Sequence, residues 1–301
     1  MTVVPAAPVH SNEQVLTVNL TDYTAIIPSA SRPHLLALSL RSMFAMLCPT
    51  PSRLLIHDDA AFPGQRSMIE AAINDCVPKH VDVICQYDDP PIFHGPALYW
   101  LLKRLPPGDE FCFYTQDDWE FLRPVPVFDA FALLRRFRLN HIRFNKRETM
   151  PYKGEGPTRW EKTEYLCPDD LDVLTGIPRE VATGAFPRGG QILTLSDHWY
   201  FQASVWRVAH IKPVVDWWFE NHLGSFRDAA EIKINHTFNG QVRLARDLPI
   251  LLPPIGAPAN HHVTRSLVQS TWIWGPIGEQ PYIRHLGVAE KDFARKGDRP
   301  G

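Results

Sequence analysis

The stretch from Phe111 to Glu120, FCFYTQDDWE, is an apolar run that ends in two adjacent acids, Asp117 and Asp118. Its apolar half is typical of a buried β-strand. Adjacent carboxylates repel each other and are costly to remove from water. A fold that places them where a buried strand ends therefore neutralises them with a cation or leaves them in solvent. The stretch predicts a strand that ends at a metal site, with a solvated turn as the alternative interpretation.

Strand-like and helix-like segments alternate before this stretch. Tyr23–Pro28 is a short β-rich run, and Pro33 then opens a helix whose apolar residues recur every three or four positions. The same order repeats, and the helix breakers at 106–108 precede the Phe111 strand. Further strands are expected at Arg53–Asp59 and Val81–Gln86, and further helices at Arg66–Asn74 and Pro96–Leu105.

This alternation with short connections predicts an α/β fold, in which helices cover both faces of a mixed, mainly parallel sheet. Such sheets bind ligands outside the carboxyl ends of their strands. The second strand also ends in paired acids, Asp58 and Asp59. We therefore expect both acid pairs to lie along one edge of the sheet.

The second half of the chain is less regular. A helix near Val125–Arg138 and a strand at His141–Phe144 precede a segment rich in Pro, Gly and charge, residues 146–195. So long a loop inside a compact domain is usually functional, which predicts a lid or insertion with small elements of its own. Beyond it we expect ordered structure at Ser196–Val208, helices at Pro213–His222 and Asp228–Ala245, and short apolar runs at Ser270–Gly275 and Tyr282–Gly287.

Composition bounds the class of protein. With 301 residues, 45% of them hydrophobic, the chain is long enough to bury a large core. No apolar run reaches the roughly 18 to 20 residues that cross a bilayer, and the first residues lack a signal-peptide pattern, so we expect a soluble, cytoplasmic protein. Five cysteines without CxxC spacing favour reduced thiols over disulfides or zinc ligands. A net charge of −2 gives no general attraction to nucleic acid.

Four segments, in this order, resemble glycosyltransferases with the GT-A fold, especially family 2-like enzymes. Thr24–Leu36 (TAIIPSASRPHLL) is similar to their opening strand, turn and helix. Leu54–Asp59 (LLIHDD) is similar to the second strand, whose terminal acid contacts the nucleotide in that family. Gln116–Trp119 (QDDW) resembles the metal-binding acid-Asp-Asp-Trp motif, and Tyr282–Gly287 (YIRHLG) the late aromatic-x-x-His-x-Gly element, whose His completes the metal shell. Gln116 departs from the pattern because it stands where the family has an acid.

The resemblance implies a metal-dependent glycosyltransferase with a Rossmann-type sheet. Such an enzyme would move a hexose or pentose from a nucleoside diphosphate sugar, expected to be UDP-linked, to a hydroxyl acceptor, with inversion. Negative charge grows on the leaving diphosphate, and a divalent cation absorbs it. Mg²⁺ and Mn²⁺ take one or two protein carboxylates plus phosphate oxygens, which fits Asp118 as the direct ligand and Asp117 nearby. His285 as a further ligand would favour Mn²⁺, although a lone histidine among 13 also has a purely structural interpretation.

The nucleotide is expected at the first loop and at the strand ends. Asp58 or Asp59 has the acceptor oxygens that a uracil N3–H or ribose hydroxyls require, although an acid at this position also caps turns. The loop between the first strand and its helix contains no glycine, which disfavours a phosphate-cradling loop of the ATP-binding type. The predicted nucleotide-binding residues are Pro28, Ser29, Arg32, Asp58, Asp59, Gln116 and Asp117.

Inverting transfer also requires a base that takes the proton of the acceptor hydroxyl. By resemblance, an acid near the start of a helix after the acceptor loop serves this role. Phe226–Lys233 fits that position and makes Glu231 the first candidate, followed by Asp228 and Asp197. An acid in a first helical turn can also simply stabilise the helix dipole.

We expect one glycosyltransferase-like domain over residues 1–301. It would comprise a nucleotide-sugar-binding half at 15–145, an insertion or lid facing the acceptor at 146–195, and an acceptor-side, metal-completing half at 196–301. Two alternatives stay open on this fold. One is a nucleotidyltransferase, which normally opens with a Gly-rich loop and a Lys that are absent here, and the other is a non-catalytic nucleotide- or glycan-binding protein, which Gln116 supports. The acceptor stays open among a saccharide, a lipid-linked glycan, a protein and a hydroxylated DNA base, and the net charge mildly disfavours DNA.

Overall fold

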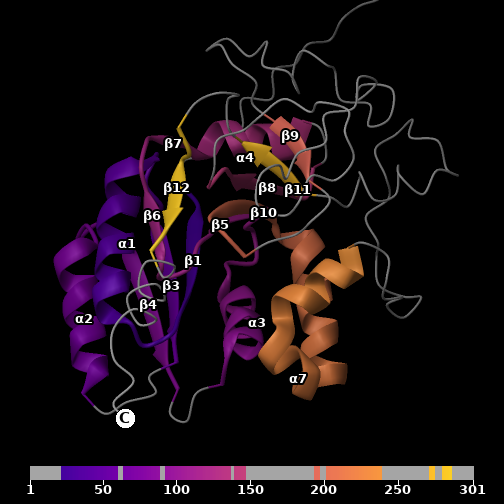
Figure 1. Cartoon of the computed structure of the whole chain (residues 1–301), viewed down its shortest axis with the longest axis horizontal. Helices are drawn as coiled ribbons and strands as arrows, with labels where there is room; N and C mark the ends of the chain where they lie inside the picture. The colour runs from indigo at the N-terminus through magenta and orange to yellow at the C-terminus, as the bar shows by residue number, and fades with distance from the viewer. Residues whose placement is uncertain are drawn as a thin grey trace, which may run out of the picture.

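The computed structural model of the chain describes residues 22–59, 64–88, 92–136, 139–146, 193–196, 201–238, 271–274 and 280–286 (Figure 1). Most of the expected insertion at 146–195 lies outside these residues, and so does Asp197. Within the described part, helices flank a central sheet (Figure 1).

Four parallel strands form the first half of this sheet, side by side in the order β4-β3-β1-β5. They are β1 (Thr24–Ser29), β3 (Arg53–Asp58), β4 (Asp82–Tyr87) and β5 (Phe111–Tyr114). Every position of β1 is buried, because helices cover both of its faces, and this explains its mainly apolar sequence. The register pairs Ser29 with Asp58, so the carboxyl ends of β1 and β3 meet at one edge.

Four more strands extend the sheet beyond β5. β10 (Ser204–Arg207) runs antiparallel between β5 and β8 (His141–Phe144). β11 (Thr271–Trp274) pairs parallel with β8 and antiparallel with β9 (Leu193–Ser196). The prediction of an α/β fold with a mixed, mainly parallel sheet flanked by helices is therefore confirmed.

The strand that was expected to end at the acid pair is β5, and a short second strand follows the acids. β5 ends at Tyr114, Asp117 and Asp118 form a turn, and β6 (Trp119–Phe121) continues the chain. β6 pairs antiparallel with β12 (Ile283–His285), which brings the late segment to the acid pair. A second small pair joins β2 (Leu47–Cys48) to β7 (Val125–Pro126).

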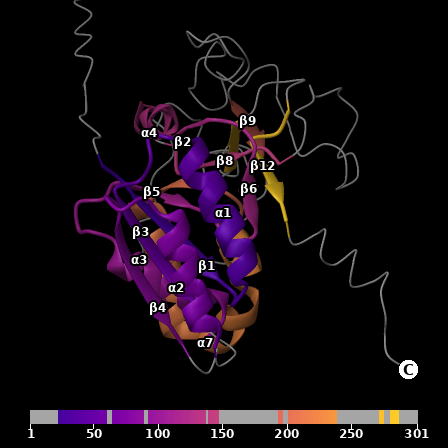
Figure 2. The same ribbon diagram turned by 90° about the vertical axis from the view of Figure 1, so that its left-hand side faces the viewer.

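Helices from different parts of the chain cover the two faces of the sheet (Figures 1 and 2). α1 (Pro33–Met46) and α2 (Gln65–Cys76) lie on one face, with α4 (Val127–Arg136) in the same core cluster, and α3 (His94–Arg104) and α7 (Val208–Phe238) lie on the other. In β1, Ala25 and Ile27 pack toward α1 and α2, whereas Ile26 packs toward α3 and α7. Successive side chains of a strand point to opposite faces, so one apolar strand supplies both halves of the core.

α7 differs from the prediction of two helices at 213–222 and 228–245. It is continuously helical from Val208 to Phe238, but it cannot be straight, because Lys233 Nζ lies 5.3 Å from the ring centroid of Trp218. Fifteen residues of straight helix would separate them by about 22 Å. The ribbon turns back on itself in Figure 1, so both halves of α7 reach the face covered by α3. The sequence predicted two helical segments, but not their continuity.

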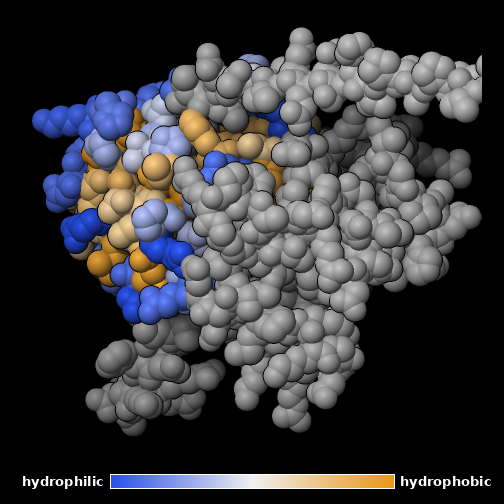
Figure 3. Space-filling view, turned by 90° about the horizontal axis from the view of Figure 1, so that it is seen from above, coloured by the Kyte–Doolittle hydropathy of each residue, from blue (hydrophilic) through white to orange (hydrophobic). Residues whose placement is uncertain are grey.

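The described surface is mixed in character. Viewed from above, hydrophilic residues border a group of hydrophobic ones (Figure 3). The large apolar side chains that are exposed come from different elements: Leu38, Met68, Ile84, Phe93, Leu122 and Leu223. In the described ranges no helix has both the length and the apolar character that a membrane span requires.

Candidate active site

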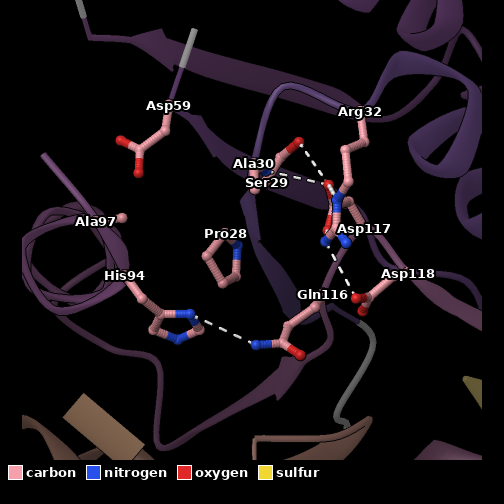
Figure 4. Close-up of a pocket in the computed structure, with 10 residues that line it drawn as sticks. All are labelled: Pro28, Ser29, Ala30, Arg32, Asp59, His94, Ala97, Gln116, Asp117 and Asp118. Carbon is pink, nitrogen blue, oxygen red and sulfur yellow. Dashed lines mark hydrogen bonds and ion pairs between the residues drawn. The ribbon is translucent and has the colours of Figure 1, made fainter. Parts of the chain in front are cut away.

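A cavity opens at the carboxyl ends of β1, β3 and β5, beside the first turn of α3 (Figure 4). Asp59, His94 and Ala97 lie on one side of it, the side chains of Arg32 and the acid pair lie on the other, and Pro28 lies between them. The lining residues are Pro28, Ser29, Ala30, Arg32, Asp59, His94, Ala97, Gln116, Asp117 and Asp118. This is the edge of the sheet at which the sequence predicted ligand binding.

Asp58 is the one predicted nucleotide-binding residue that does not line the cavity. Its carboxylate is fully buried and accepts hydrogen bonds from the backbone N–H of Ser31, at 3.3 Å, and from the Ser31 hydroxyl, at 3.2 Å. Ser31 has φ = 56°, a left-handed conformation that is uncommon for residues other than glycine. Asp58 therefore stabilises the loop after β1, and its neighbour Asp59 is the acid that faces the cavity.

Both carboxylate oxygens of Asp117 accept hydrogen bonds from the loop after β1. Its Oδ2 accepts hydrogen bonds from the Ser29 hydroxyl at 3.3 Å, the Ala30 N–H at 3.1 Å and Arg32 Nε at 3.2 Å. Arg32 Nη2 donates to the other oxygen, Oδ1. Burial raises the pKa of Asp117, and the guanidinium of Arg32 opposes that rise. The residue joins the end of β5 to the start of α1.

Asp118 has one occupied and one unoccupied carboxylate oxygen. Oδ2 lies 3.1 Å from Arg32 Nη2 and 3.1 Å from His285 Nε2. Oδ1 is buried and has no hydrogen-bond partner within the described part of the chain. Burial raises the pKa of Asp118, but the hydrogen bond with His285 and the charge of Arg32 outweigh it and hold the pKa below its usual value. Asp118 is therefore an ionised carboxylate whose Oδ1 is removed from water and can still accept a donor or a cation.

His285 reaches this position through strand pairing. β12 places it directly opposite Trp119, with ring centroids 4.7 Å apart, and the N–H of Leu286 donates to the Asp118 carbonyl at 2.8 Å. The sequence predicted that His285 and Asp118 share one site although they are 167 residues apart. The structure brings the two side chains into direct contact.

The residues at this point fit a divalent cation of the hard type. A buried carboxylate oxygen without a partner requires either a donor or a cation, and the imidazole of His285 contacts Oδ2, the other oxygen of the same carboxylate. No group of three or more His, Cys, Asp or Glu side chains suited to a metal ion occurs among the described residues. Mg²⁺ and Mn²⁺ bound with substrate phosphates need only one or two protein ligands, so Asp118 and His285 would be the ligands.

Gln116 and His94 form the opposite, uncharged part of the cavity, and their hydrogen bonds fix each other's orientation. The indole N–H of Trp119 can only donate, so Gln116 Oε1, at 3.3 Å, accepts. Gln116 Nε2 then donates to His94 Nδ1 at 3.5 Å. The proton of His94 therefore sits on Nε2, which faces the Tyr114 hydroxyl at 3.2 Å.

His94 is neutral in this arrangement. Burial lowers its pKa to about 4, and its ring stacks on Phe201 with centroids 4.4 Å apart. His94 was not predicted as a site residue, because the helix was expected to begin at Pro96. Ala30 and Ala97 were not predicted either, because alanine carries no functional group that marks a site. The available signal was position, because the first turn of a helix that follows a parallel strand faces the carboxyl edge of the sheet.

Asp59 carries the second acid group that faces the cavity. Its Oδ1 accepts a hydrogen bond from the Ile92 N–H at 3.1 Å, and burial raises its pKa above the usual value. The backbone N–H of Phe93 also donates to this carboxylate and, with that of Ile92, opposes the rise. Two carboxylate oxygens have more lone pairs than these two donors use, so Asp59 keeps acceptor capacity at the end of the cavity that lies away from the acid pair.

The predicted bases lie outside the set of lining residues. Glu231 accepts a hydrogen bond from the Phe201 N–H at 2.7 Å, and burial raises its pKa. It lies in the second half of α7 rather than in a first helical turn, so a role as a helix-dipole partner is excluded. Because Phe201 stacks on His94, Glu231 lies one residue behind the cavity wall. The side chain of Asp228 and all of Asp197 lie outside the described residues.

Comparison with known proteins gives similarity at the level of structure. No family model and no curated protein matches the chain. A mannosyltransferase from Pyrobaculum calidifontis, in complex with GDP-Man and Mn²⁺, is 11% identical over 93% of this chain and 76% of that one, with a TM-score of 0.45. 4-Diphosphocytidyl-2C-methyl-D-erythritol synthase from Anaerococcus prevotii is 11% identical over 70% of this chain and 86% of that one, with a TM-score of 0.39. Mouse xyloside xylosyltransferase 1 in its apo form is 9% identical over 68% of this chain and 73% of that one, with a TM-score of 0.34.

Proposed function

We propose that this chain is a metal-dependent glycosyltransferase that moves a hexose or pentose from a nucleoside diphosphate sugar, UDP-linked, to a hydroxyl acceptor with inversion. The observation that carries the proposal is the buried Asp118 Oδ1 without a partner, next to His285 at the carboxyl edge of the sheet. Such an oxygen fits a cation that is shared with phosphate oxygens better than it fits a structural role.

The charged end of the cavity suits a leaving diphosphate. When the bond between the sugar and the diphosphate breaks, negative charge grows on the bridging oxygen, and a bound Mn²⁺ or Mg²⁺ would supply the positive charge that stabilises it. Asp118 and His285 would hold the cation, and Asp117 keeps Arg32 directed toward the same place. Ser29 and Arg32 of the first loop would contact the nucleotide, with Pro28 as the floor of the cavity.

The other end suits the nucleoside. Asp59 offers an acceptor oxygen for a uracil N3–H or a ribose hydroxyl, and Ala97, on the same side of the cavity, has only a small side chain. Gln116, where the related enzymes carry an acid, presents an amide whose Oε1 and one N–H are already engaged by Trp119 and His94. We assign it to ribose contact through the remaining N–H rather than to metal binding, because an amide donor cannot serve a cation.

Glu231 is the candidate base. A general base works best with a pKa near the working pH, and burial moves the pKa of Glu231 in that direction. Its contact with Phe201 places it on the α7 side of the cavity, which is where an acceptor would approach if the donor lies along the β1 edge. Asp228 and Asp197 follow it as candidates.

Incubation of the chain with Mn²⁺ and a panel of UDP, GDP and CDP sugars tests the proposal. We expect slow hydrolysis of at least one UDP sugar in the absence of an acceptor, detected as released UDP, and its loss when EDTA is added. No hydrolysis and no binding of any nucleotide sugar would contradict the proposed function.

A non-catalytic nucleotide-binding protein is the second candidate, and Arg32 is the observation that favours it. This guanidinium already neutralises both acids without a metal. Metal-dependent UDP binding in the same assay, without turnover of any sugar at any pH between 6 and 9, would favour this candidate over the enzyme.

A further inference from the structure

Arg32 is the only permanently charged cation among the described residues that line the cavity, and it contacts both acids of the pair. Its side chain is 32% exposed, whereas those of Asp117 and Asp118 are 1% and 9% exposed. A guanidinium at the mouth of the cavity therefore neutralises two carboxylates that lie deeper.

The two contacts are unequal. Toward Asp117, Arg32 uses both Nε and Nη2, one on each carboxylate oxygen, which is the two-point geometry in which arginine binds carboxylates most firmly. Toward Asp118 it offers only Nη2, which is already engaged by Asp117, at 3.1 Å. The link to Asp118 is the weaker one, and it can break while Arg32 stays bound to Asp117.

Asp118 Oδ2 is shared between Arg32 and His285, and its other oxygen, Oδ1, has no partner within the described part of the chain. A divalent ion on Asp118 would lie within a few ångströms of the guanidinium, and like charges at such a distance repel strongly in a partly desolvated site. Arg32 thus occupies the electrostatic position that a metal ion would take. A diphosphate removes the conflict, because it attracts both positive charges.

We propose that Arg32 is a built-in counter-ion that competes with the metal for Asp118 until a nucleoside diphosphate binds. Arg32 then leaves Asp118 for a phosphate oxygen while Asp117 keeps it in place. The inference rests on the proposed function and adds to it an order of events, in which the chain binds the metal weakly alone and tightly together with the diphosphate. Each ligand therefore raises the affinity for the other by the same factor.

The Arg32→Met variant tests this inference, because it removes the charge and keeps most of the length of the side chain. We would measure Mn²⁺ affinity by electron paramagnetic resonance with and without UDP, and UDP affinity by calorimetry. We expect Arg32→Met to bind Mn²⁺ alone roughly 10-fold more tightly than the native chain and UDP roughly 10-fold more weakly, within the usual range of coupling between sites. Unchanged or weaker binding of Mn²⁺ alone would overturn the inference.

Two further variants control the charge and the fold. Arg53→Met removes a surface guanidinium that is paired with Asp82 at 2.9 Å, far from the cavity, and should bind Mn²⁺ and UDP as the native chain does. Arg32→Lys keeps the positive charge and should keep the weak affinity for Mn²⁺ alone. Should Arg32→Met fail to fold, Arg32→Lys and the native chain still decide, since equal Mn²⁺ affinity of the native chain with and without UDP overturns the inference.

The same measurements separate this inference from the proposed function. A native chain that binds neither Mn²⁺ nor UDP contradicts both. A native chain that binds both ligands, together with an Arg32→Met variant whose metal affinity is unchanged, contradicts only the role of Arg32.

Discussion

The cavity has two polar walls, of which one is charged and the other is neutral. The charged wall, formed by Arg32, Asp117 and Asp118, relies on ion pairs between deeply buried acids and one arginine. The neutral wall, formed by His94 and Gln116, relies on hydrogen bonds between uncharged groups, and burial holds the pKa of His94 at about 4. Under the proposed function, the charged wall would face the diphosphate and the cation, and the neutral wall would face the uncharged part of the ligand.

The largest effect is expected from Asp118→Ala, which tests the role of the charged wall. The change removes the partnerless oxygen and one of the two expected metal ligands, so we expect Mn²⁺ affinity and UDP-sugar turnover to fall by at least roughly 10- to 100-fold. Stability should change less, because Asp118 holds no backbone N–H through its side chain. Calorimetric Mn²⁺ titration and a UDP-release assay measure both effects.

Asp82→Ala serves as the matched control, since Asp82 is half exposed and pairs only at the surface. Its Mn²⁺ affinity and turnover should equal those of the native chain. Native affinity and turnover in Asp118→Ala would remove Asp118 from the site.

Asp117→Ala should affect stability first. Asp117 accepts from the Ala30 N–H, the Ser29 hydroxyl and Arg32, and its loss leaves those donors without their partner. Unsatisfied buried groups of this kind cost about 3 kcal/mol in the free energy of unfolding, measured by urea denaturation. Asp82→Ala, which removes the surface ion pair with Arg53, should lower the free energy of unfolding by less than about 0.5 kcal/mol. Equal losses in the two variants would show that Asp117 has no special role in joining β5 to α1.

His94 should make the neutral wall sensitive to acid. Its pKa of about 4 in the folded chain lies below the usual 6.5, so the unfolded chain binds a proton first as pH falls. Stability is therefore unaffected by this group above pH 6.5, and it decreases as pH falls from 6.5 toward 4. Because the ring is partly exposed to the cavity, we expect a loss of about 1 to 2 kcal/mol over this interval.

The variant His94→Asn should remove that part of the pH dependence, as followed by the unfolding midpoint in urea at a series of pH values. His80→Asn, at an exposed position, should leave the native profile unchanged. A native-like profile in His94→Asn would assign the acid sensitivity to other buried histidines, such as His141 and His210.

The two walls also differ in how far the sequence predicts them. The strands and the acids at their ends were predictable, because an apolar run followed by Asp117 and Asp118 specifies both a buried strand and the point at which it reaches the edge of the sheet. The adjacency of His285 and Asp118 followed from the family resemblance. The contact of Arg32 with the acid pair did not, because a side chain in one loop acquires a partner 85 residues away only through the sheet register.

Other features depend on geometry that no local pattern encodes. Asp58 and Asp59 are adjacent acids in the sequence, but in the structure Asp58 ends β3 and bonds to the left-handed Ser31, whereas Asp59 follows the strand and lines the cavity. The helix α7 was predicted as two segments, because the sequence pattern gives no sign that the helical conformation continues from Val208 to Phe238. The tautomer of His94 depends on the orientation of Gln116, which Trp119 fixes three residues further on.

The smallest effect is expected from variants of Gln116, which test why the neutral wall carries no charge. Gln116→Glu would place a carboxylate in the neutral wall. The new carboxylate could still accept from the Trp119 N–H, but it would favour a protonated His94 at its side. We expect the pKa of His94 to rise by about one unit from its value of about 4, as followed by NMR titration of the ring protons. Gln116→Met, which removes the amide without adding charge, should not raise the pKa. If both variants leave the pKa where it is, burial against Phe201 alone keeps the wall neutral. If only Gln116→Glu raises it, the neutrality of this wall depends on the uncharged amide of Gln116.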